Sequence, residues 1–282
     1  MTPNFGLVVV GYESDAEWPD FFRCLAASAQ LPRSIVVVDN SPTCRIEPHV
    51  GKELSVTIRH EPGNLGYGGA ANRGVAQLPE DLEWVVICNP DTRVEPDTFD
   101  ELMAHLEVLP RTAVVGPAII TPNNEVYPSA RAIPGIRIGI GHALLGDLWP
   151  NNPWSLAYLG NRTSGEARSA GWLSGAFLMI NRAAFDSVGG FDEQYFMFFE
   201  DVDLGFRMKK AGLRNVYVPS ARVHHSGAHA TASREKDMLV AHHRSAEIFL
   251  AKLYPRWFHA PLRGLLRRGL RVRAWVRTRG MN

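Results

Sequence analysis

Short apolar runs alternate with segments of helical periodicity through the first 120 residues. The apolar runs predict strands at Leu7–Val10, Ile35–Val38, Val56–Ile58, Trp84–Cys88 and Ala113–Ile120. Apolar residues at helical spacing predict helices over Asp20–Ala29, Gly69–Ala76 and Asp97–Leu109. Alternating strands and helices form mostly parallel sheets whose two faces are covered by helices. We therefore expect an α/β fold with a Rossmann-like central sheet of the nucleotide-binding type.

The pattern weakens in the middle of the chain and then resumes. Residues between Tyr127 and Arg168 are rich in Pro, Gly, Asn and Trp, which favours long ordered loops. Beyond them the pattern predicts a strand at Trp172–Ile180, a helix at Asp201–Ala211 and a strand at Asn215–Val218. We expect one domain over residues 1–247, with a nucleotide-binding half (1–122) and an acceptor-binding and catalytic half (123–247).

A basic extension over residues 248–282 has nine basic and no acidic side chains, although the whole chain has a net charge of only +1. Between Phe258 and Val276 most apolar residues fall on one helical face, while Arg263, Arg267 and Arg271 line the other and Arg273 lies on the apolar side. This pattern predicts an amphipathic helix on an anionic membrane surface. A helix packed on the body with a solvated basic face is the alternative. Because the rest of the chain is acidic and no nucleic-acid recognition motif is present, we expect no nucleic-acid partner.

Composition limits the class and the compartment. With 45% apolar residues the chain can bury a large core, and its three cysteines form no paired motif that would indicate a disulfide framework or a zinc site. The N-terminal run is too short for a signal peptide, and no stretch reaches the length of a membrane-spanning helix. We expect a cytoplasmic protein, peripheral on the inner face of the cell membrane. The sequence sets no oligomeric state.

Loops after the predicted strands are the candidate ligand-binding segments, because open parallel sheets bind ligands beyond the carboxyl ends of their strands. The first loop is GYES, and the second places Asp39 and Asn40 directly after a strand. An aspartate there suits a base or ribose, and it is equally common in a plain turn. The third loop, GNLGYGGAANRG (Gly63–Gly74), suits a diphosphate, although it lacks the lysine of a P-loop and also fits a flexible connection.

Two acidic segments are the candidates for chemistry. The run VVICNPDTRV (Val85–Val94) ends a strand with Asp91, which fits either a simple turn or a metal-binding carboxylate. The segment FFEDVDLGFRM begins a helix with Glu200, Asp201 and Asp203 in its first turn. A helix dipole favours carboxylates there, but capping explains one acid and not three beside a cluster of phenylalanines.

The ordered set GYES, VVDNS, GNLGYGGAANRG, CNPDT, the long segment from GWLSG to MKKAG, and VHHSG resembles the family 2 inverting glycosyltransferases with the GT-A fold. The resemblance covers roughly residues 5 to 230. Within that family, YPSAR, NNPW and GWLSG look most like the actinobacterial enzymes that add L-rhamnose to polyprenyl-diphosphate N-acetylglucosamine. The resemblance implies dTDP-L-rhamnose as donor, that lipid as acceptor, and a part in building the arabinogalactan linker of the cell wall.

The same resemblance implies roles for individual residues. Asp201 is the general base, with Glu200 beside it, and Asp91 and His225 hold Mg²⁺ or Mn²⁺, with His224 as the alternative to His225. Asn89 stands where the family's metal motif has its first acid, which removes a charge. The nucleotide sugar meets Gly11, Tyr12, Glu13, Asp39, Asn40, Asn64, Gly66, Asn72, Asn89 and Asp91, and the acceptor meets Arg131, Trp172 and Gly175.

Three other functions fit parts of the pattern. Sugar-nucleotide pyrophosphorylases share a related layout, but they carry an Arg- and Lys-containing glycine loop after the first strand, which GYESDAEW lacks. A non-catalytic carbohydrate-binding protein is the second alternative, since a fold does not fix an activity. The third is a glycosyltransferase that acts on a different lipid-linked or O-antigen acceptor.

Overall fold

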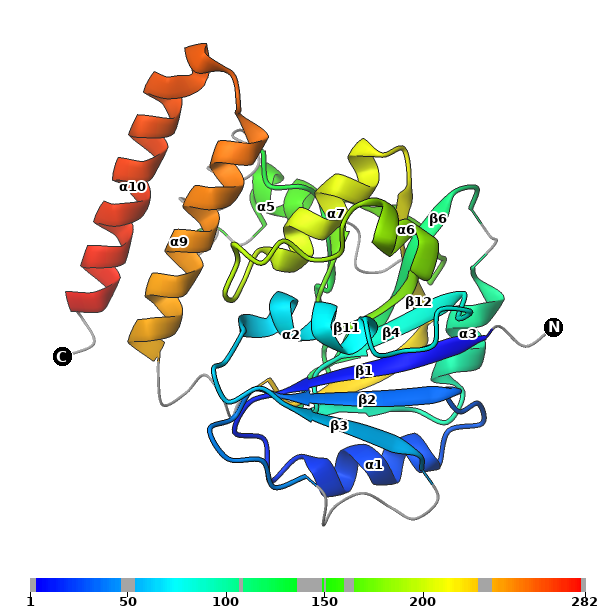
Figure 1. Cartoon of the computed structure of the whole chain (residues 1–282). Coiled ribbons are helices and arrows are strands. Elements are labelled where there is room, and N and C mark those ends of the chain that lie inside the picture. The colour runs from blue at the N-terminus through cyan, green and yellow to red at the C-terminus, as the bar shows by residue number, and fades with distance from the viewer. Residues whose placement is uncertain are drawn as a thin grey trace.

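The structure is a computed structural model of the chain. It describes residues 4–46, 54–106, 109–135, 149, 151–159, 165–227 and 235–279, without the side chains of 235, 236 and 273–279. Figure 1 shows a central twisted sheet with helices on both faces and two long C-terminal helices side by side at one edge.

The main sheet has ten strands within the described ranges, and eight of them run in the order β3-β2-β1-β4-β11-β6-β12-β5. The strands are β1 (Phe5–Gly11), β2 (Ser34–Asp39), β3 (Val56–His60), β4 (Trp84–Cys88), β5 (Thr92–Val94), β6 (Thr112–Ile120), β7 (Val126–Tyr127), β9 (Arg168–Ala170), β11 (Phe177–Asn181) and β12 (Arg214–His225). Strands β3, β2, β1 and β4 are parallel to one another, and β6 is parallel to β12. Strand β11 runs antiparallel between β4 and β6, and β5 runs antiparallel to β12. A separate pair joins β8 (Ala130–Arg131) to β10 (Trp172–Leu173).

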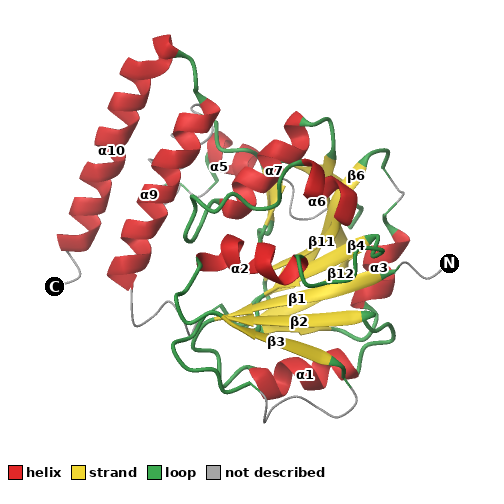
Figure 2. Ribbon diagram, viewed as in Figure 1, coloured by secondary structure: helices red, strands yellow, loops and turns green. Residues whose placement is uncertain are grey.

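Helices cover both faces of this sheet, as Figure 2 shows. They are α1 (Trp18–Ala26), α2 (Gly66–Val75), α3 (Thr98–Ala104), α5 (Pro153–Leu159), α6 (Arg182–Ser187), α7 (Glu200–Lys210), α9 (Glu235–Leu253) and α10 (Ala260–Arg279), with a 3-10 turn η2 (Trp257–His259) before α10. Strand β1 explains the two layers, because its residues alternate: Leu7 and Val9 pack with α1 and α3, while Val8 and Val10 pack with α2, α6 and α7. Both sets are buried, as expected for a parallel strand covered on two sides.

The structure confirms the mostly parallel α/β sheet and corrects several elements. The expected strand at Trp172–Ile180 is wrong in its continuity, because Ser174–Ala176 separates β10 from β11 and the two strands belong to different sheets. The segment expected to be loops contains α5 as well as short strands. Strand β12 is longer than predicted and continues to His225, which carries its last residues to the end of the sheet near β5.

The C-terminal region is helical. Helix α9 begins at Glu235 and ends at Leu253, so the domain boundary expected at residue 247 lies inside a continuous helix. Phe249 in α9 is buried against Trp172, Tyr195 and Val202, which attaches this helix to the body. Among the described helices, none has both the length and the apolar character needed to cross a membrane.

Candidate active site

The loops after β1 and β2 lie side by side at the carboxyl ends of these two parallel strands. Gly11, the last residue of β1, is in register with Asp39, the last of β2, and the Asn40 N–H donates to the Gly11 carbonyl at 2.8 Å. Asp39 accepts hydrogen bonds from the backbone and hydroxyl of Ser41, at 3.1 and 2.6 Å. The Ser41 hydroxyl also accepts from the Glu13 N–H at 2.6 Å, so the GYES loop is tied to the end of β2.

The glycine-rich loop is held between β2 and the segment before α7. Asn40 donates to the Gly66 carbonyl at 3.2 Å and accepts from the Leu65 N–H at 3.3 Å. Gly66 has φ +74°, and a Cβ there would lie 2.2 Å from the Phe196 carbonyl oxygen, so this turn requires glycine. Asn64, whose φ is also positive, accepts from the Gly66 N–H at 3.1 Å.

Asn72 makes a different contact from the one expected of a diphosphate neighbour. Its amide donates to the Phe191 carbonyl and accepts from the Phe191 N–H, both at 2.9 Å. This pair of hydrogen bonds fixes α2 to the segment that leads into α7. The observed contact is structural, and a part for Asn72 in binding a diphosphate stays a prediction.

The Asn-Pro-Asp-Thr segment after β4 is both a turn and a carboxylate site. Thr92 is buried and its hydroxyl donates to the Asn89 carbonyl at 2.7 Å, which closes the turn. Asp91 points instead to the end of β12, where its Oδ1 lies 3.1 Å from His225 Nε2 and its Oδ2 accepts from the Gly227 N–H at 3.0 Å. The Asn89 amide nitrogen lies 3.3 Å from the same His225 nitrogen. The turn and ligand interpretations of Asp91 are therefore compatible.

The surroundings keep Asp91 ionised. Burial favours the neutral acid, but hydrogen bonding and charge from His225, together with the Gly227 N–H, outweigh it and lower the pKa of Asp91. Of the two histidines only His225 contacts Asp91, because side chains alternate along β12 and His224 lies 3.0 Å from Glu95. No group of three or more His, Cys, Asp or Glu side chains gathers for a metal in the parts of the chain that are described. An ion here would have Asp91 and His225 as its protein ligands, with substrate oxygens completing the shell.

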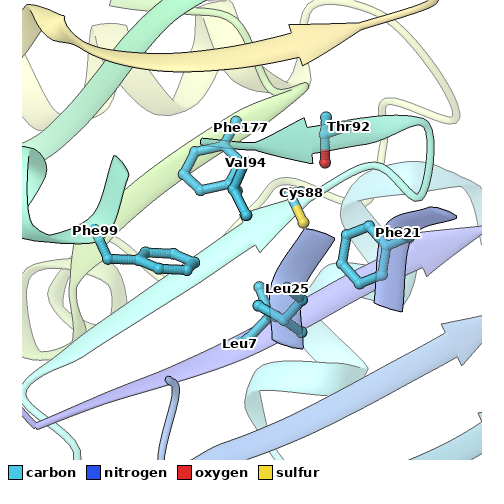
Figure 3. A pocket seen from close by; sticks show the side chains of 8 residues that line it. All are labelled: Leu7, Phe21, Leu25, Cys88, Thr92, Val94, Phe99 and Phe177. Atoms are coloured by element: carbon cyan, nitrogen blue, oxygen red, sulfur yellow. The ribbon is translucent and has the colours of Figure 1, made fainter. Parts of the chain in front are cut away.

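The Asp91 turn rests on a filled apolar layer. Figure 3 shows Leu7, Phe21, Leu25, Phe99 and Phe177 converging beside Cys88 and Thr92. These side chains come from β1, α1, α3 and β11, and all are buried. The layer is packed core rather than a binding cavity, and it holds the turn rigidly.

The acid pair stands at the first turn of α7. Phe198 and Phe199 precede it with φ of +65° and +66°, a left-handed conformation that costs non-glycine residues of order 1–3 kcal/mol each. This reversal places Glu200 and Asp201 at the N-terminus of the helix, where the dipole favours negative charge. Two consecutive strained residues indicate a geometry that the surrounding structure must enforce.

Glu200 and Asp201 differ in their environments. Asp201 accepts from the Gly175 N–H at 2.9 Å and from the Val202 N–H at 2.8 Å. Burial raises the pKa of Asp201, and these two N–H groups and the charge of Arg131 oppose the rise. Burial and the Asp201 charge raise the pKa of Glu200 to about 8. The Glu200 Oε2 is buried without a hydrogen-bond partner among the described residues, which is consistent with a neutral acid beside an ionised one.

Arg131 lies in a cluster of aromatic rings next to this pair. Its guanidinium carbon is 5.2 Å from the centre of the Tyr127 ring, 5.3 Å from Trp172 and 5.6 Å from Tyr158. It donates to the Tyr127 hydroxyl and to the Pro128 carbonyl, both at 2.7 Å. Arg131 is therefore pre-oriented by cation–π contacts and hydrogen bonds.

The aromatic cluster changes the interpretation of Trp172. Only 6% of Trp172 is exposed, and its indole N–H donates to the Ala132 carbonyl at 3.0 Å. Helix α7 packs so closely that a Cβ added at Gly205 would lie 2.6 Å from the Trp172 Cβ. The observed contacts make the ring a core element that supports Arg131, and a part for Trp172 in binding the acceptor stays a prediction. Sequence reasoning missed Tyr127 and Tyr158 as neighbours of Arg131, and it also missed Tyr67, whose hydroxyl donates to the Gly175 carbonyl. Tyr127 lies in the YPSAR segment, but no local signal marks Tyr158.

The fold and the site define an α/β protein with a polar site at the carboxyl ends of parallel strands, closed by an acid pair on a separate helix. The model of the family described as "Glycosyltransferase like family 2" matches residues 3–240. The N-acetylglucosaminyl-diphospho-decaprenol L-rhamnosyltransferase of Mycobacterium tuberculosis is 41% identical over 99% of this chain and 94% of its own length. The O-antigen chain rhamnosyltransferase WbaN of Salmonella anatum is 24% identical over 79% of this chain and 66% of its own length.

A solved structure supports the fold. The mannosyltransferase PcManGT of Pyrobaculum calidifontis, in complex with GDP-Man and Mn²⁺, superposes with a TM-score of 0.60 at 16% identity, over 91% of this chain and 65% of its own. The chain belongs to the family 2 glycosyltransferases. The predicted GT-A fold and the predicted enzyme class, a glycosyltransferase, are both confirmed.

Proposed function

We propose that this enzyme transfers L-rhamnose from dTDP-L-rhamnose to polyprenyl-diphosphate-linked N-acetylglucosamine, with inversion, in synthesis of the arabinogalactan linker of the cell wall. The observation that carries the proposal is the 41% identity, over nearly the full length of both chains, to the mycobacterial protein whose name describes this transfer. The geometry of the site agrees with the proposal, because it provides separate groups for a diphosphate leaving group and for deprotonation of an acceptor hydroxyl.

Asp201 is the general base in this proposal. Its carboxylate takes the proton of the acceptor hydroxyl while the acceptor oxygen bonds to the anomeric carbon and the bond from that carbon to the diphosphate breaks. Burial raises the pKa of Asp201, and the Gly175 and Val202 N–H groups and the Arg131 charge oppose that rise by stabilising the ionised form. Glu200 stays protonated beside it, so the pair does not carry two repelling charges.

The donor occupies the strand-end loops. Gly11, Tyr12, Glu13, Asp39 and Asn40 form the nucleotide side. Asn64, Gly66, Asn72 and Asn89 lie toward the diphosphate. Asp91 and His225 would hold Mg²⁺ or Mn²⁺, and the bound ion would supply positive charge to stabilise the diphosphate as a leaving group. The lowered pKa of Asp91 and its contact with His225 support this assignment, as does the Mn²⁺ named for the similar mannosyltransferase structure.

The acceptor lies on the side of the acid pair, within residues 123–247. Arg131 contacts the acceptor, Trp172 holds Arg131 in place, and Gly175 lets the acceptor hydroxyl approach Asp201. A Cβ at Gly175 would lie 3.4 Å from the Asp201 Cβ, so any side chain there would project beside the base.

The C-terminal helices bring the enzyme to its lipid acceptor on the inner face of the cell membrane. Trp257 is 85% exposed and Leu265 69% exposed, beside exposed Arg267 and Arg268. Apolar side chains with neighbouring arginines are typical of helices that lie in the interface of an anionic bilayer. The side chains beyond Val272, including Arg273 and Val276, lie outside the described residues.

A different lipid-linked or O-antigen acceptor is the second candidate, favoured by the similarity to the Salmonella O-antigen enzyme. The deciding experiment is a radiolabelled transfer assay with dTDP-L-rhamnose and polyprenyl-diphosphate N-acetylglucosamine. The matched arms replace either the donor by dTDP-glucose or the acceptor sugar by galactose. Transfer with dTDP-L-rhamnose and the N-acetylglucosamine acceptor, and in neither matched arm, supports the proposal, whereas transfer only to another acceptor would replace it.

A further inference from the structure

Helix α9 covers the strained turn that precedes the acid pair. The His242 ring lies 5.5 Å from that of Phe198 and 5.2 Å from that of Phe199, and the Phe249 ring lies 5.7 Å from Phe199. The Ser245 hydroxyl donates to the Met197 carbonyl at 2.8 Å. One face of α9 is therefore packed against the segment that sets the position of α7.

An ion network joins α9 to α7 itself. Asp203 in the first turn of α7 is fully buried, and its Oδ1 lies 2.8 Å from Lys252 Nζ of α9. Its Oδ2 accepts from Arg207 at 2.6 Å, and Arg207 also donates to the Val188 carbonyl at 2.6 Å. Lys252 further pairs with Asp192 and lies 4.9 Å from the centre of the Tyr195 ring. A buried carboxylate that uses both oxygens on cations fixes the groups around it.

This network acts at the helix end that carries the acids. Asp203 is two residues from Asp201, and the Asp203 N–H donates to the Phe199 carbonyl at 2.8 Å, the first backbone hydrogen bond of the helix. Because Phe198 and Phe199 are held in left-handed conformations, a loosened first turn would relax them and move Asp201 from the Gly175 N–H. The pairing of Asp203 with Lys252 and Arg207 counters that relaxation.

We propose that Lys252 is a positioning residue, which holds Asp201 against the Gly175 backbone by anchoring Asp203 from the C-terminal helix. The proposal rests on the proposed function, since it takes Asp201 as the general base. In this proposal α9 helps to position the acid pair. The ion network also connects α7, which carries Glu200 and Asp201, to α9 and α10, the two helices proposed to bind the membrane.

The test compares Lys252 variants in the full-length enzyme. Lys252→Met removes the cation and keeps much of the apolar stem, while Lys252→Arg keeps the charge. Ser245→Ala is the matched control, because it removes a contact of α9 with the preceding segment but leaves the ion network. Each variant is assayed below its melting temperature for kcat and KM with both substrates, and dTDP-rhamnose binding is measured by calorimetry.

We expect Lys252→Met to lower kcat by about tenfold to a hundredfold, because a small displacement of a catalytic group costs rate on that scale. Donor binding stays unchanged, and Lys252→Arg and Ser245→Ala stay near the parent rate. Hydrogen exchange in residues 199–203 should increase in Lys252→Met relative to Ser245→Ala.

A second variant covers the case in which Lys252→Met fails to fold. The pair Asp203→Asn with Lys252→Met removes the fully buried carboxylate together with its lysine partner. The charges that lose a partner are Arg207 and Asp192, whose side chains are both 21% exposed, so we expect the double variant to fold while keeping the loss of kcat. A lower melting temperature with parental kcat in either variant would overturn the positioning role and leave a purely structural ion pair. Asp201→Asn separates the two proposals: if that variant is active, the assignment of the base fails, and if it is inactive while Lys252→Met is normal, only the role of Lys252 fails.

Discussion

The two carboxylate sites of this enzyme are built in opposite ways. Asp91 follows a central strand directly, and its turn is closed by Thr92 only one residue away over a filled apolar layer. The acid pair follows two residues in left-handed conformation. Asp201 accepts from the distant Gly175 N–H and is affected by the Arg131 charge, while α9 pairs with Asp203 in the same helical turn. The turn that presents Asp91 is closed locally, although its carboxylate meets His225 and Gly227 from a distant segment, whereas the position of the acid pair depends on long-range packing.

The same difference appears in the acidity of the two sites. Asp91 and Glu200 are both largely buried, yet the pKa of Asp91 is lowered because His225 and the Gly227 N–H stabilise its charge. The pKa of Glu200 is raised because burial and the neighbouring Asp201 charge oppose ionisation, and the hydrogen bond from its own backbone N–H offsets them only in part. Partners, rather than burial alone, decide which carboxylate stays charged. A charged group suits the diphosphate side, and a neutral acid beside an ionised base suits the acceptor side.

Removal of the proposed base should have the largest effect on turnover. Asp201→Asn keeps the size of the side chain and an oxygen for the Val202 N–H but cannot take the acceptor proton, so we expect kcat to fall by about 10²- to 10⁴-fold. The measurement is steady-state transfer with saturating donor. Calorimetry with dTDP-rhamnose is the control and should give parental affinity. Loss of donor affinity would show that Asp201 binds the donor, and it would contradict separate roles for the two carboxylate sites.

The locally held site should respond differently. Asp91→Asn removes the charge that would neutralise the leaving group through a metal, so we expect kcat to fall by about 10²-fold and the Mn²⁺ concentration for half-maximal rate to rise. The melting temperature should change little, because the turn is closed by Thr92 and not by Asp91. Thr92→Val is the matched variant, with the reverse expectation of lower stability at a nearly normal metal requirement. Unchanged turnover and metal dependence in Asp91→Asn would show that Asp91 is only a turn residue and not a metal ligand.

The contrast between local and distant support also explains which features the sequence predicts. The strands from β1 to β4 and the Asp91 turn follow from apolar runs and turn residues within a few positions of each other. The break between β10 and β11 was not predicted, because Leu173 and Phe177 are both buried and the apolar pattern continues across it. The break between the two strands depends on Gly175, whose N–H donates to Asp201 and whose carbonyl accepts from the Tyr67 hydroxyl. Both partners are distant in sequence.

The acid site shows the same limit. The pattern located Glu200 and Asp201 at a helix start, but nothing near them in sequence indicates Tyr158 over Arg131 or Lys252 on Asp203. Lys252 lies in a segment that the sequence assigns to a basic tail, whereas its charge is used inside the body. Local patterns predict residue types at a site, and only the packing of distant elements shows which of them are held together.

The raised pKa of Glu200 can be tested through the pH dependence of the stability of the folded protein. The pKa of Glu200 is about 8 in the folded protein, above its usual 4.5. Below pH 4.5 the acid is protonated in both states, and as pH rises toward 8 only the unfolded chain loses the proton, so stability falls across this window. Glu200→Gln is neutral at every pH and lacks this loss. We expect its melting temperature, relative to the parent enzyme, to increase by several degrees from about pH 5 to about pH 8.5, measured by scanning calorimetry. Glu125→Gln, at an exposed carboxylate, is the control, and parallel pH profiles for the parent and Glu200→Gln would show that Glu200 is ionised.

Truncation after Leu253 should have the smallest effect on chemistry and a clear effect on location. It keeps Lys252 and all of α9, so the acid pair retains its support. It removes α10, which packs on α9, together with surface ion pairs such as that of Arg271 with Glu247, which contribute little. With a short-chain, water-soluble acceptor we expect kcat to stay within about twofold of the parent, since no group of the proposed site lies beyond Leu253.

Binding to anionic liposomes should be lost, because the removed segment carries eight arginines, each contributing about 1 kcal/mol when it lies near such a surface. Co-sedimentation at rising salt measures this, and full-length binding should weaken as screening increases. A full-length variant with Arg263, Arg267 and Arg268 changed to Gln keeps the helix and removes charge, so intermediate binding is expected. Equal liposome binding by the truncated and full-length enzymes would place the membrane contact elsewhere on the body.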